Sequence, residues 1–282
     1  SKMNCICTFG YTGDPIHGGC QACIAGTYKD VNGTAACELC QSGKYSNATG
    51  ATLESTCEDC PSASFSRLGS TMRSNCTCNV GYTGPDGGPC TACVGGKYKA
   101  AGGSAECTLC GVGKYSTAVG ATNVSTCLNC PAATYSSVDR VQCLSCPSDS
   151  TSPTSSDELT DCTCNAGYSG PDGGACAACA AGTYKADNGS SPCVLCPRGK
   201  FSTEVAEISE ATCSACAVHS YSQEGSRLAT NCTCNKGYTG ADGDVCTACA
   251  AGKYKDVNGS KPCSQCRPGK YSAQEGGPSA AT

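Results

Sequence analysis

The sequence predicts a small disulfide-rich fold, built as an elongated tandem array of short β-hairpin cysteine-rich modules with little helix. Three observations lead to this prediction. Cysteine supplies 32 of the 282 residues, Leu, Ile, Val and Phe together supply only 29, and the cysteines recur at short regular spacings. So few branched apolar side chains cannot offset the entropy of ordering a chain that also contains 36 Gly. Disulfides are therefore expected to provide most of the stability.

Four Cys-x-Cys pairs, each followed by Gly-Tyr-Thr/Ser-Gly, mark an internal repeat. The repeat predicts four cysteine-rich units, which we call repeats 1 to 4: residues 1–75, residues 76–161 with one extra Cys-x-x-Cys module, residues 162–231, and a partial unit at 232–282. Because the last repeat stops at a Cys-x-x-Cys module and a QEGGPSAAT tail, we expect an excised window of a longer array. No signal-peptide pattern begins at Ser1, so any signal peptide is expected to have been removed or to lie outside the window.

A smaller module of about sixteen residues repeats inside these units. An aromatic residue stands five positions after the second cysteine of nearly every pair, and only Thr151 breaks this rule. Each module is expected to form a β-hairpin with Gly or Asn at its turn, as at Asn32-Gly33, Gly102-Gly103, Asn188-Gly189 and Asn258-Gly259. Modules that contact mainly their neighbours predict a rod. Residues 147–161, rich in Ser and Thr, are expected to form an exposed, O-glycosylated insert or bend.

Two disulfide connectivities are compatible with this spacing. In one, the second cysteine of each pair bonds to the first cysteine of the next pair. In the other, cysteines interleave in fours, which the six cysteines between Cys23 and Cys76 do not allow uniformly. The first scheme leaves Cys5 and Cys266 as candidate inter-unit thiols, and its fifteen loops are worth about 3 kcal/mol each in the chain-entropy model. It pairs Cys7 with Cys20, Cys23 with Cys37, Cys40 with Cys57, Cys60 with Cys76, Cys78 with Cys90, Cys93 with Cys107, Cys110 with Cys127, Cys130 with Cys143, Cys146 with Cys162, Cys164 with Cys176, Cys179 with Cys193, Cys196 with Cys213, Cys216 with Cys232, Cys234 with Cys246, and Cys249 with Cys263.

Cysteines and glycosylation sequons together predict an extracellular or cell-surface location. A disulfide framework persists in an oxidising compartment. Sequons for N-glycosylation occur at Asn32, Asn47, Asn75, Asn123, Asn188, Asn231 and Asn258. A net charge of −4 with 15% charged residues leaves no basic stripe for nucleic acid, and no apolar run reaches the roughly 20 residues that span a bilayer.

The order of the motifs resembles a known repeat. CxAC-xxGxYK, CxxC-xxGKYS, CxxC-x-ATYS and CxCxxGY follow one another as in the ephrin-receptor-like cysteine-rich repeat, which is related to EGF-like and tumour-necrosis-factor-receptor-like modules. GYTGPDGGP between Cys78 and Cys90 also resembles the closing hairpin of an EGF module. Long arrays of this kind resemble surface proteins of algae and other protists, including shaft proteins of flagellar hairs (mastigonemes). The resemblance implies a spacer or filament.

Enzymatic and cofactor functions find little support in the residues. The Cys-x-x-Cys spacing suits zinc, but the sequons and Cys-x-Cys interruptions favour disulfides, and no βαβ unit supports a thioredoxin-like motif. His17 and His219 lie in different repeats and are interpreted as surface residues. We therefore predict no cofactor, no metal and no catalytic residue. A recurring acid beside glycine suggests calcium but is interpreted as turn chemistry, at Asp14, Asp86, Asp172 and Asp242.

The aromatic series has two interpretations. Each ring is expected to pack over a disulfide and the backbone of the next module. Alternatively, exposed rings bind another strand or a glycan, with the lysine that follows some of them as a polar partner. Those lysines are Lys29, Lys99, Lys185 and Lys255.

The sequence thus predicts a non-enzymatic secreted structural glycoprotein that forms a rigid rod, shaft or filament subunit. Its partners are expected to be copies of itself, head to tail or lateral, together with its covalent glycans. The alternative is the ligand-binding or adhesive stalk of a cell-surface receptor, for which residues 131–161 are the only atypical segment.

Overall fold

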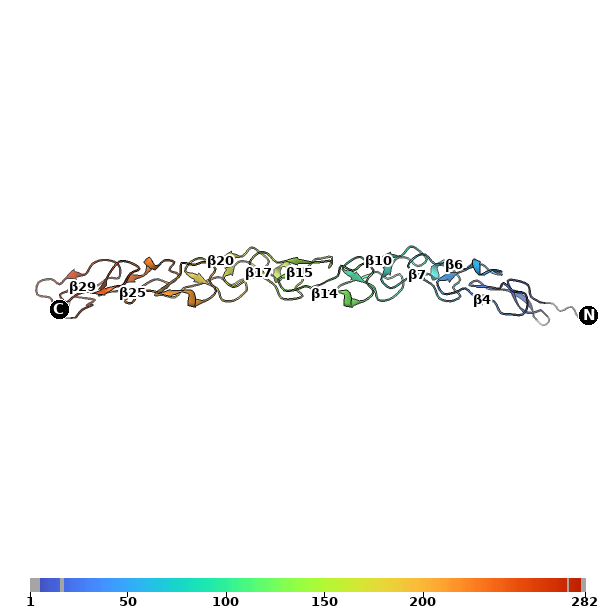
Figure 1. Ribbon diagram of the computed structural model, residues 1–282, viewed down its shortest axis with the longest axis horizontal. Helices are drawn as coiled ribbons and strands as arrows, with labels where there is room; N and C mark the ends of the chain where they lie inside the picture. Colours follow the sequence, from blue (N-terminus) through green and yellow to red (C-terminus); the bar gives the residue numbers. More distant parts are fainter. Residues whose placement is uncertain (1–5, 16–17, 273, 280–282) are drawn as a thin grey trace, which may run out of the picture. The chain divides into compact units, whose positions relative to one another are not determined.

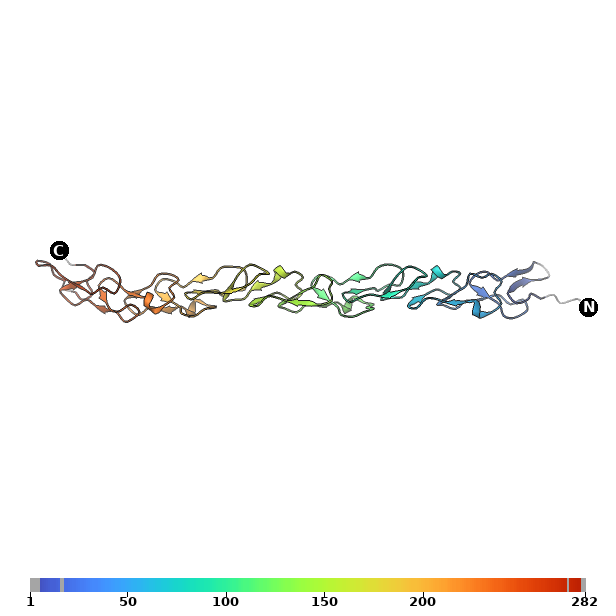
Figure 2. The same cartoon turned by 90° about the horizontal axis from the view of Figure 1, so that it is seen from above.

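The computed structural model describes residues 6–15, 18–272 and 274–279. They belong to two compact units: an N-terminal unit of residues 1–130 and 136–144, and a C-terminal unit of residues 131–135 and 145–282. Within each unit, two-stranded antiparallel hairpins follow one another in chain order (Figure 1). Figure 2 shows the same succession from above. The described residues form no α-helix, and none of their helical turns is long and apolar enough to cross a membrane.

Strands of the N-terminal unit pair consecutively. The pairs are β1 (Tyr11–Asp14) with β2 (Gly19–Ala22), β3 (Thr27–Tyr28) with β4 (Glu38–Leu39), β5 (Lys44–Tyr45) with β6 (Glu58–Asp59), β7 (Ser64–Phe65) with β8 (Thr77–Cys78), β9 (Tyr82–Thr83) with β10 (Thr91–Ala92), β11 (Lys97–Tyr98) with β12 (Thr108–Leu109), and β13 (Lys114–Tyr115) with β14 (Leu128–Asn129). Strands β15 (Thr134–Ser136) and β16 (Cys143–Ser145) contain the residues at which the chain passes between the units.

The C-terminal unit repeats the pattern. Its pairs are β17 (Ser150–Thr151) with β18 (Thr163–Cys164), β19 (Tyr168–Ser169) with β20 (Ala177–Ala178), β21 (Thr183–Tyr184) with β22 (Val194–Leu195), β23 (Lys200–Phe201) with β24 (Ser214–Ala215), β25 (Ser220–Tyr221) with β26 (Thr233–Cys234), β27 (Tyr238–Thr239) with β28 (Thr247–Ala248), and β29 (Lys253–Tyr254) with β30 (Ser264–Gln265). Single 3₁₀ turns precede several closing cysteines: η1 (Glu54–Thr56), η2 (Arg73–Asn75), η3 (Val124–Thr126), η4 (Leu159–Asp161), η5 (Glu210–Thr212) and η6 (Ala229–Asn231).

The disulfides follow the nearest-neighbour scheme and not the interleaved one. Fifteen bonds link the second cysteine of each pair to the first of the next, from Cys7–Cys20 to Cys249–Cys263, across 12 to 17 residues. Cys266 is a free thiol, and Cys5 lies outside the described residues. The fold is therefore the predicted tandem array of small disulfide-rich β-hairpin modules.

A left-handed turn connects each Cys-x-x-Cys pair to the following strand. In most modules a glycine occupies it, because positive φ costs an L-residue about 1–2 kcal/mol. Gly26 (φ 78°) is typical: its N–H donates to the carbonyl of Ser46 in the next module at 2.8 Å, and its carbonyl accepts from Cys40 N–H at 2.8 Å. Ala63, Ala133, Asp149 and His219 adopt positive φ at the same module position. This turn thus joins neighbouring modules through backbone hydrogen bonds.

The buried interior consists mainly of sulfur. Most of the buried hydrophobic residues are half-cystines, and the buried cluster formed by Tyr28, Cys40, Ala51 and Cys57 places a tyrosine against the disulfide of the next module. The packing interpretation of the aromatic series is confirmed at Tyr28. Most other rings of the series are half-buried, whereas Phe65 and Tyr271 are exposed.

The prediction of an insert or bend at residues 147–161 is wrong, whereas the predicted exposure holds for most of its residues. Thr151 lies in β17, which pairs with β18, and Ser152 is buried with its Oγ donating to Thr134 O at 2.9 Å. The segment therefore forms an ordinary module, equivalent to residues 61–75, in which Thr151 occupies the place of Phe65. Its polar composition is misleading because the inward position of these hairpins accepts serine.

Candidate functional site

In the modules that follow a Cys-x-x-Cys pair, the residue six positions after the second cysteine, directly after the aromatic or Thr151, points inward. At this position the described modules place only two residue types, lysine and serine, and both are buried in almost every case. Burying a polar group is costly unless its hydrogen bonds are satisfied. Lysine and serine satisfy their hydrogen bonds with different sets of acceptors. The lysine side chains have the larger sets and define the candidate site.

Lysine occupies the inward position once in each repeat. The side chains of Lys29, Lys99, Lys185 and Lys255 are only 1%, 4%, 3% and 2% exposed. The interpretation of these residues as polar partners of exposed rings is wrong, because they are buried. A buried ammonium needs acceptors for its three protons. The structure supplies backbone carbonyl oxygens for them.

Lys185 has the largest set of acceptors. Its Nζ donates to Tyr168 O at 2.8 Å, to Cys164 O at 3.4 Å and to Gly189 O. The other three lysines each donate to the two equivalent carbonyls, those of the tyrosine in the Gly-Tyr motif and of the glycine in the hairpin loop. The ammonium thus joins one hairpin to the loop of the next.

Backbone and asparagine contacts complete this arrangement, which we call the lysine junction: the Cys-x-Cys segment, the Gly-Tyr turn, the inward lysine and the Asn-Gly or Gly-Gly loop. In repeat 3, Gly189 N–H donates to Cys164 O at 2.8 Å, Gly167 N–H donates to Lys185 O at 2.9 Å, and Asn188 Oδ1 accepts from Ala166 N–H at 2.9 Å. Asn32 and Asn258 accept in the same way. In repeat 2, Gly102 stands in place of the asparagine, and the other contacts remain.

Electrostatics at the junction are those of a desolvated cation. Burial lowers the pKa of Lys255, and the carboxylate of Asp242 opposes that shift. Asp242 Oδ1 is itself buried and is the one buried side-chain oxygen or nitrogen among the described residues without a hydrogen-bond partner. The charge on the lysine is therefore held chiefly by carbonyl dipoles.

Close backbone approach explains the glycine in the Gly-Tyr motif. A Cβ built on Gly167 (φ 82°) would lie 2.4 Å from Ala206 O, and one on Gly81 would lie 2.3 Å from Gly120 O. By contrast, a Cβ on Gly43 or Gly199 would meet nothing within 4 Å. The turn needs glycine for space only where a second module crosses it.

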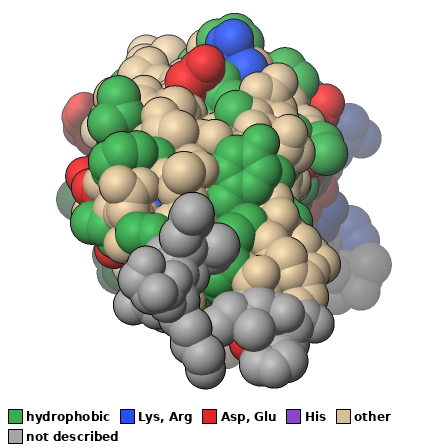
Figure 3. Space-filling view, turned by 90° about the vertical axis from the view of Figure 1, so that its right-hand side faces the viewer, with side chains coloured by type: hydrophobic (Ala, Val, Ile, Leu, Met, Phe, Trp, Pro, Cys, Tyr) green, Lys and Arg blue, Asp and Glu red, His purple; other side chains and the backbone are tan. Residues whose placement is uncertain are grey.

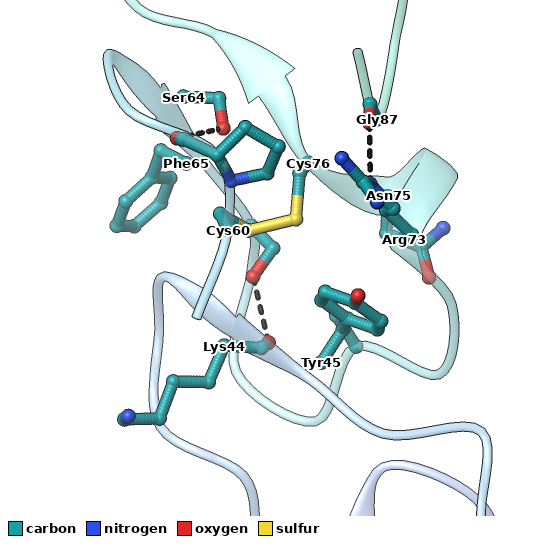
Figure 4. The surroundings of a disulfide bond; sticks show 12 residues. Lys44, Tyr45, Cys60, Ser64, Phe65, Arg73, Asn75, Cys76 and Gly87 are labelled. Atoms are coloured by element: carbon teal, nitrogen blue, oxygen red, sulfur yellow. Dashed lines mark hydrogen bonds between the residues drawn. A yellow bond between two sulfur atoms is a disulfide. The ribbon is translucent and has the colours of Figure 1, made fainter. Parts of the chain in front are cut away.

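Serine at the inward position bonds within a shorter reach. Ser66 Oγ donates to Lys44 O at 2.8 Å, beside the Cys60–Cys76 disulfide (Figure 4), and Ser222 Oγ donates to Lys200 O at 2.8 Å. Tyrosine hydroxyls form outer contacts: Tyr28 donates to Glu38 at 3.0 Å, which raises the pKa of Tyr28 to about 12, and a bond to Glu58 raises the pKa of Tyr45.

The remaining candidate residues lie on the surface. All seven sequon asparagines are exposed, and six of them accept a hydrogen bond through Oδ1. His219 is exposed and stacks on Tyr238, with ring centroids 4.0 Å apart, whereas His17 lies outside the described residues. Asp86 and Asp172 are exposed. Because thirty cysteines form disulfides, their sulfurs are not thiolate ligands for zinc.

On the face shown in Figure 3, the described residues form no patch of one charge. Hydrophobic side chains lie on this face among polar, acidic and basic ones. Ile6, Phe9 and Tyr11 are exposed hydrophobic residues of the N-terminal unit.

These features define a class of protein: a tandem array of disulfide-bonded β-hairpin repeats in which each module bonds to its neighbours. Three stretches match the family model described as tyrosine-protein kinase ephrin type A/B receptor-like: residues 10–57, 81–127 and 167–210. Each match begins at the glycine of a lysine junction. The chain thus contains three tandem ephrin-receptor-like cysteine-rich repeats, of a kind typical of extracellular proteins. No curated protein matches the chain.

Sequence reasoning alone misses the lysine junction. A charged residue after an exposed-looking ring is normally placed at the surface. The available signal was the restriction of this position to Lys or Ser, together with the constant spacing of about 21 residues between each Cys-x-Cys pair and its lysine. That regularity indicates a fixed contact and not a free surface charge.

Proposed function

We propose that this chain is part of a non-enzymatic, secreted structural glycoprotein that forms a stiff rod, shaft or filament. The observation that carries the proposal is the use of the inward side chains. Within each unit, the buried lysines and serines bond the carbonyls of adjacent hairpins, and every disulfide closes a short local loop. Such contacts restrict hinge motion between neighbouring modules.

The exposed sequons support the same function, because they offer sites for N-linked glycans. Glycans are bulky, polar and carried on the surface, and they limit lateral pairing of exposed strand edges. We propose copies of the same chain as partners, arranged head to tail, because the two ends of such a repeat present different faces. No cofactor enters this proposal.

Imaging of the secreted full chain by negative-stain electron microscopy tests this function. Fibres, or straight rods whose length increases by a constant amount per added repeat, are the expected result. Freely bent particles that remain monomeric at high concentration would contradict it. A matched double variant carrying Lys99→Met and Lys185→Met should bend at the altered junctions while its disulfides remain intact.

A receptor stalk is the second candidate, favoured by the description of the matching family. In this proposal the chain spaces or presents a separate ligand-binding region outside the cell. The inserted module around Arg140 is the most atypical segment, and Arg140 Nη1 donates back to Cys110 O at 2.6 Å. Saturable binding of a protein ligand by the chain, abolished by deleting residues 131–146 so that Cys130 takes the place of Cys146 and can pair with Cys162, would favour the stalk over the filament.

A further inference from the structure

Five of the seven N-glycosylation sequons occupy two structurally different positions that recur between repeats. Asn32, Asn188 and Asn258 lie in the loops of lysine junctions, whereas Asn75 and Asn231 end the 3₁₀ turns η2 and η6, directly before a disulfide-bonded cysteine. The residue that stands at the equivalent position of repeat 2, in place of asparagine, indicates the role of each position.

At the 3₁₀ position, the equivalent residue of repeat 2 is Asp161. Its Oδ2 accepts hydrogen bonds from the N–H groups of Asp157 and Glu158 at 3.0 and 3.2 Å. Asn75 Oδ1 accepts from Thr71 and Met72 at 3.1 Å each, in the same pattern. Asp161, which cannot carry an N-linked sugar, therefore accepts the same two backbone hydrogen bonds as Asn75. This position requires an acceptor oxygen that caps the turn.

The rest of that sequon is enclosed by the fold. Cys76 is buried and bonded to Cys60, its carbonyl accepts from Gly87 N–H at 2.7 Å, and Arg73 Nε donates to Gly87 O (Figure 4). Thr77, whose hydroxyl a glycosylating enzyme must reach, lies half-buried in β8 and donates to Phe65 O at 3.5 Å. Closure of the disulfide therefore fixes the sequon between two backbone segments.

The loop position has the opposite properties. Gly102 replaces asparagine in repeat 2, and the junction still forms there, so the fold does not require an acceptor at this place. Asn32 and the hydroxyl residue Thr34 are both exposed, and no cysteine interrupts the sequon. Asn32 and Asn75 are both exposed and both accept through Oδ1, so the two positions differ in the hydroxyl residue, in the cysteine and in the need for an acceptor, and not in the asparagine side chain itself.

We propose that Asn32, Asn188 and Asn258 carry N-linked glycans and that Asn75 and Asn231 remain unmodified capping residues. The proposal deepens the proposed secreted glycoprotein and rests on it. In the transfer, Asn Nδ2 loses a proton to a base of the transferase and bonds to the anomeric carbon of an oligosaccharide. The bond from that carbon to a lipid diphosphate breaks, and the diphosphate leaves with the bonding electrons.

Site-resolved mass spectrometry of the full chain, secreted from eukaryotic cells, tests this division. Enzymatic release of the glycans in heavy-oxygen water marks every asparagine that carried one. The expected result is a majority of molecules marked at Asn32, Asn188 and Asn258, and a minority at Asn75 and Asn231. Equal occupancy of the two classes would overturn the division, whereas a secreted chain without any mark would overturn the glycoprotein proposal itself.

Paired cysteine variants test the role of the disulfide. Cys60→Ser should raise occupancy at Asn75 from a minority to a majority of molecules and leave Asn231 unchanged, and Cys216→Ser should do the reverse. The double variant Cys60→Ser/Cys76→Ser removes both cysteines and so leaves no unpaired thiol. It should give the same rise in occupancy at Asn75. Unchanged occupancy at Asn75 in both variants would overturn the disulfide argument.

The capping role has its own test. Asn75→Asp, which copies the residue at 161, should leave secretion, glycan mass and protease resistance unchanged. Asn75→Ala should lower protease resistance near η2 without a loss of glycan mass. A loss of one glycan in either variant would overturn the assignment of Asn75.

Discussion

Two hairpins, β21–β22 in repeat 3 and β25–β26 where repeat 3 meets repeat 4, carry different residues at the inward position, and the difference shows how the array is joined. In the β21–β22 hairpin this position is Lys185, whose ammonium reaches three carbonyls. In the β25–β26 hairpin it is Ser222, whose hydroxyl reaches only the carbonyl of Lys200. The strand registers are alike. The length of the inward side chain therefore matches the distance to the carbonyls that it bonds, one of which, Gly189 O, lies in the loop of its own hairpin.

The largest effect is expected where the longer side chain is removed. Lys185→Met keeps the apolar stem but removes the ammonium donor from the carbonyls of Tyr168 and Gly189, whereas Cys164 O keeps the N–H of Gly189, so the local free energy of opening should fall by about 3 kcal/mol. Hydrogen exchange at the amide of Gly189, which donates to Cys164 O, measures that opening. Lys200→Met is the matched control: it removes a surface ion pair with Glu210 and should cost less than about 1 kcal/mol. Similar losses in both variants would contradict the junction.

A second prediction concerns space at the left-handed turn. Gly182 and Gly199 have φ of 78° and 77°, but a Cβ would lie 2.4 Å from Gly225 O at the first and meet nothing within 4 Å at the second. Gly182→Ala should therefore lower local stability by about 2 to 3 kcal/mol, and Gly199→Ala by about 1 kcal/mol, the strain of positive φ alone. Limited proteolysis measures the loss of local stability in each variant. Equal losses in the two variants would contradict the close approach of Gly225 O to Gly182.

Removing the serine contact should have a smaller effect than removing the lysine contact. Ser222→Ala loses one hydrogen bond to Lys200 O and should reduce protection of the adjacent amides by about 1 kcal/mol. Ser214→Ala, on an exposed strand position of the neighbouring hairpin, is the control and should change little. A loss of amide protection in Ser222→Ala as large as that in Lys185→Met would contradict the different roles of the two inward residues.

The smallest effect on stability is expected at a tyrosine hydroxyl. Because the pKa of Tyr28 is raised to about 12 by its bond to Glu38, the neutral hydroxyl contributes stability below about pH 10 that is lost as the pH rises through about 12. Absorbance titration should show Tyr28 still protonated near pH 11, where ordinary tyrosines are ionised. Glu38→Gln should lower its pKa towards 10. An unchanged titration curve in that variant would contradict the assignment.

Much of the fold could be predicted from the sequence because the spacing of the cysteines limits it strongly. Nearest-neighbour pairing requires only that loops of 12 to 17 residues close, and a ring five residues beyond most Cys-x-x-Cys pairs marks a strand of the hairpin. The repeat also predicted ephrin-receptor-like modules without a helical core. These features depend on local spacing, which a single sequence records directly.

The rest depended on contacts between modules, which local patterns do not show. The burial of Lys29 follows from carbonyls 18 and 4 residues away that only the folded hairpins bring together. The insert or bend predicted at residues 147–161 is wrong for the same reason, because the segment forms a paired hairpin in which Ser152 and Ser156 are polar but buried. Their polar character predicts exposure for these residues, but contacts with the neighbouring module bury them.

Reduction of the disulfides followed by limited proteolysis tests the central claim most directly. The oxidised chain should resist a broad-specificity protease across residues 18–272, and dithiothreitol should make every module susceptible, since a sulfur-rich interior with so few aliphatic side chains cannot hold the hairpins together. A reduced, alkylated chain that kept the same protected fragments would show that packing and hydrogen bonds alone support the array, contrary to this account.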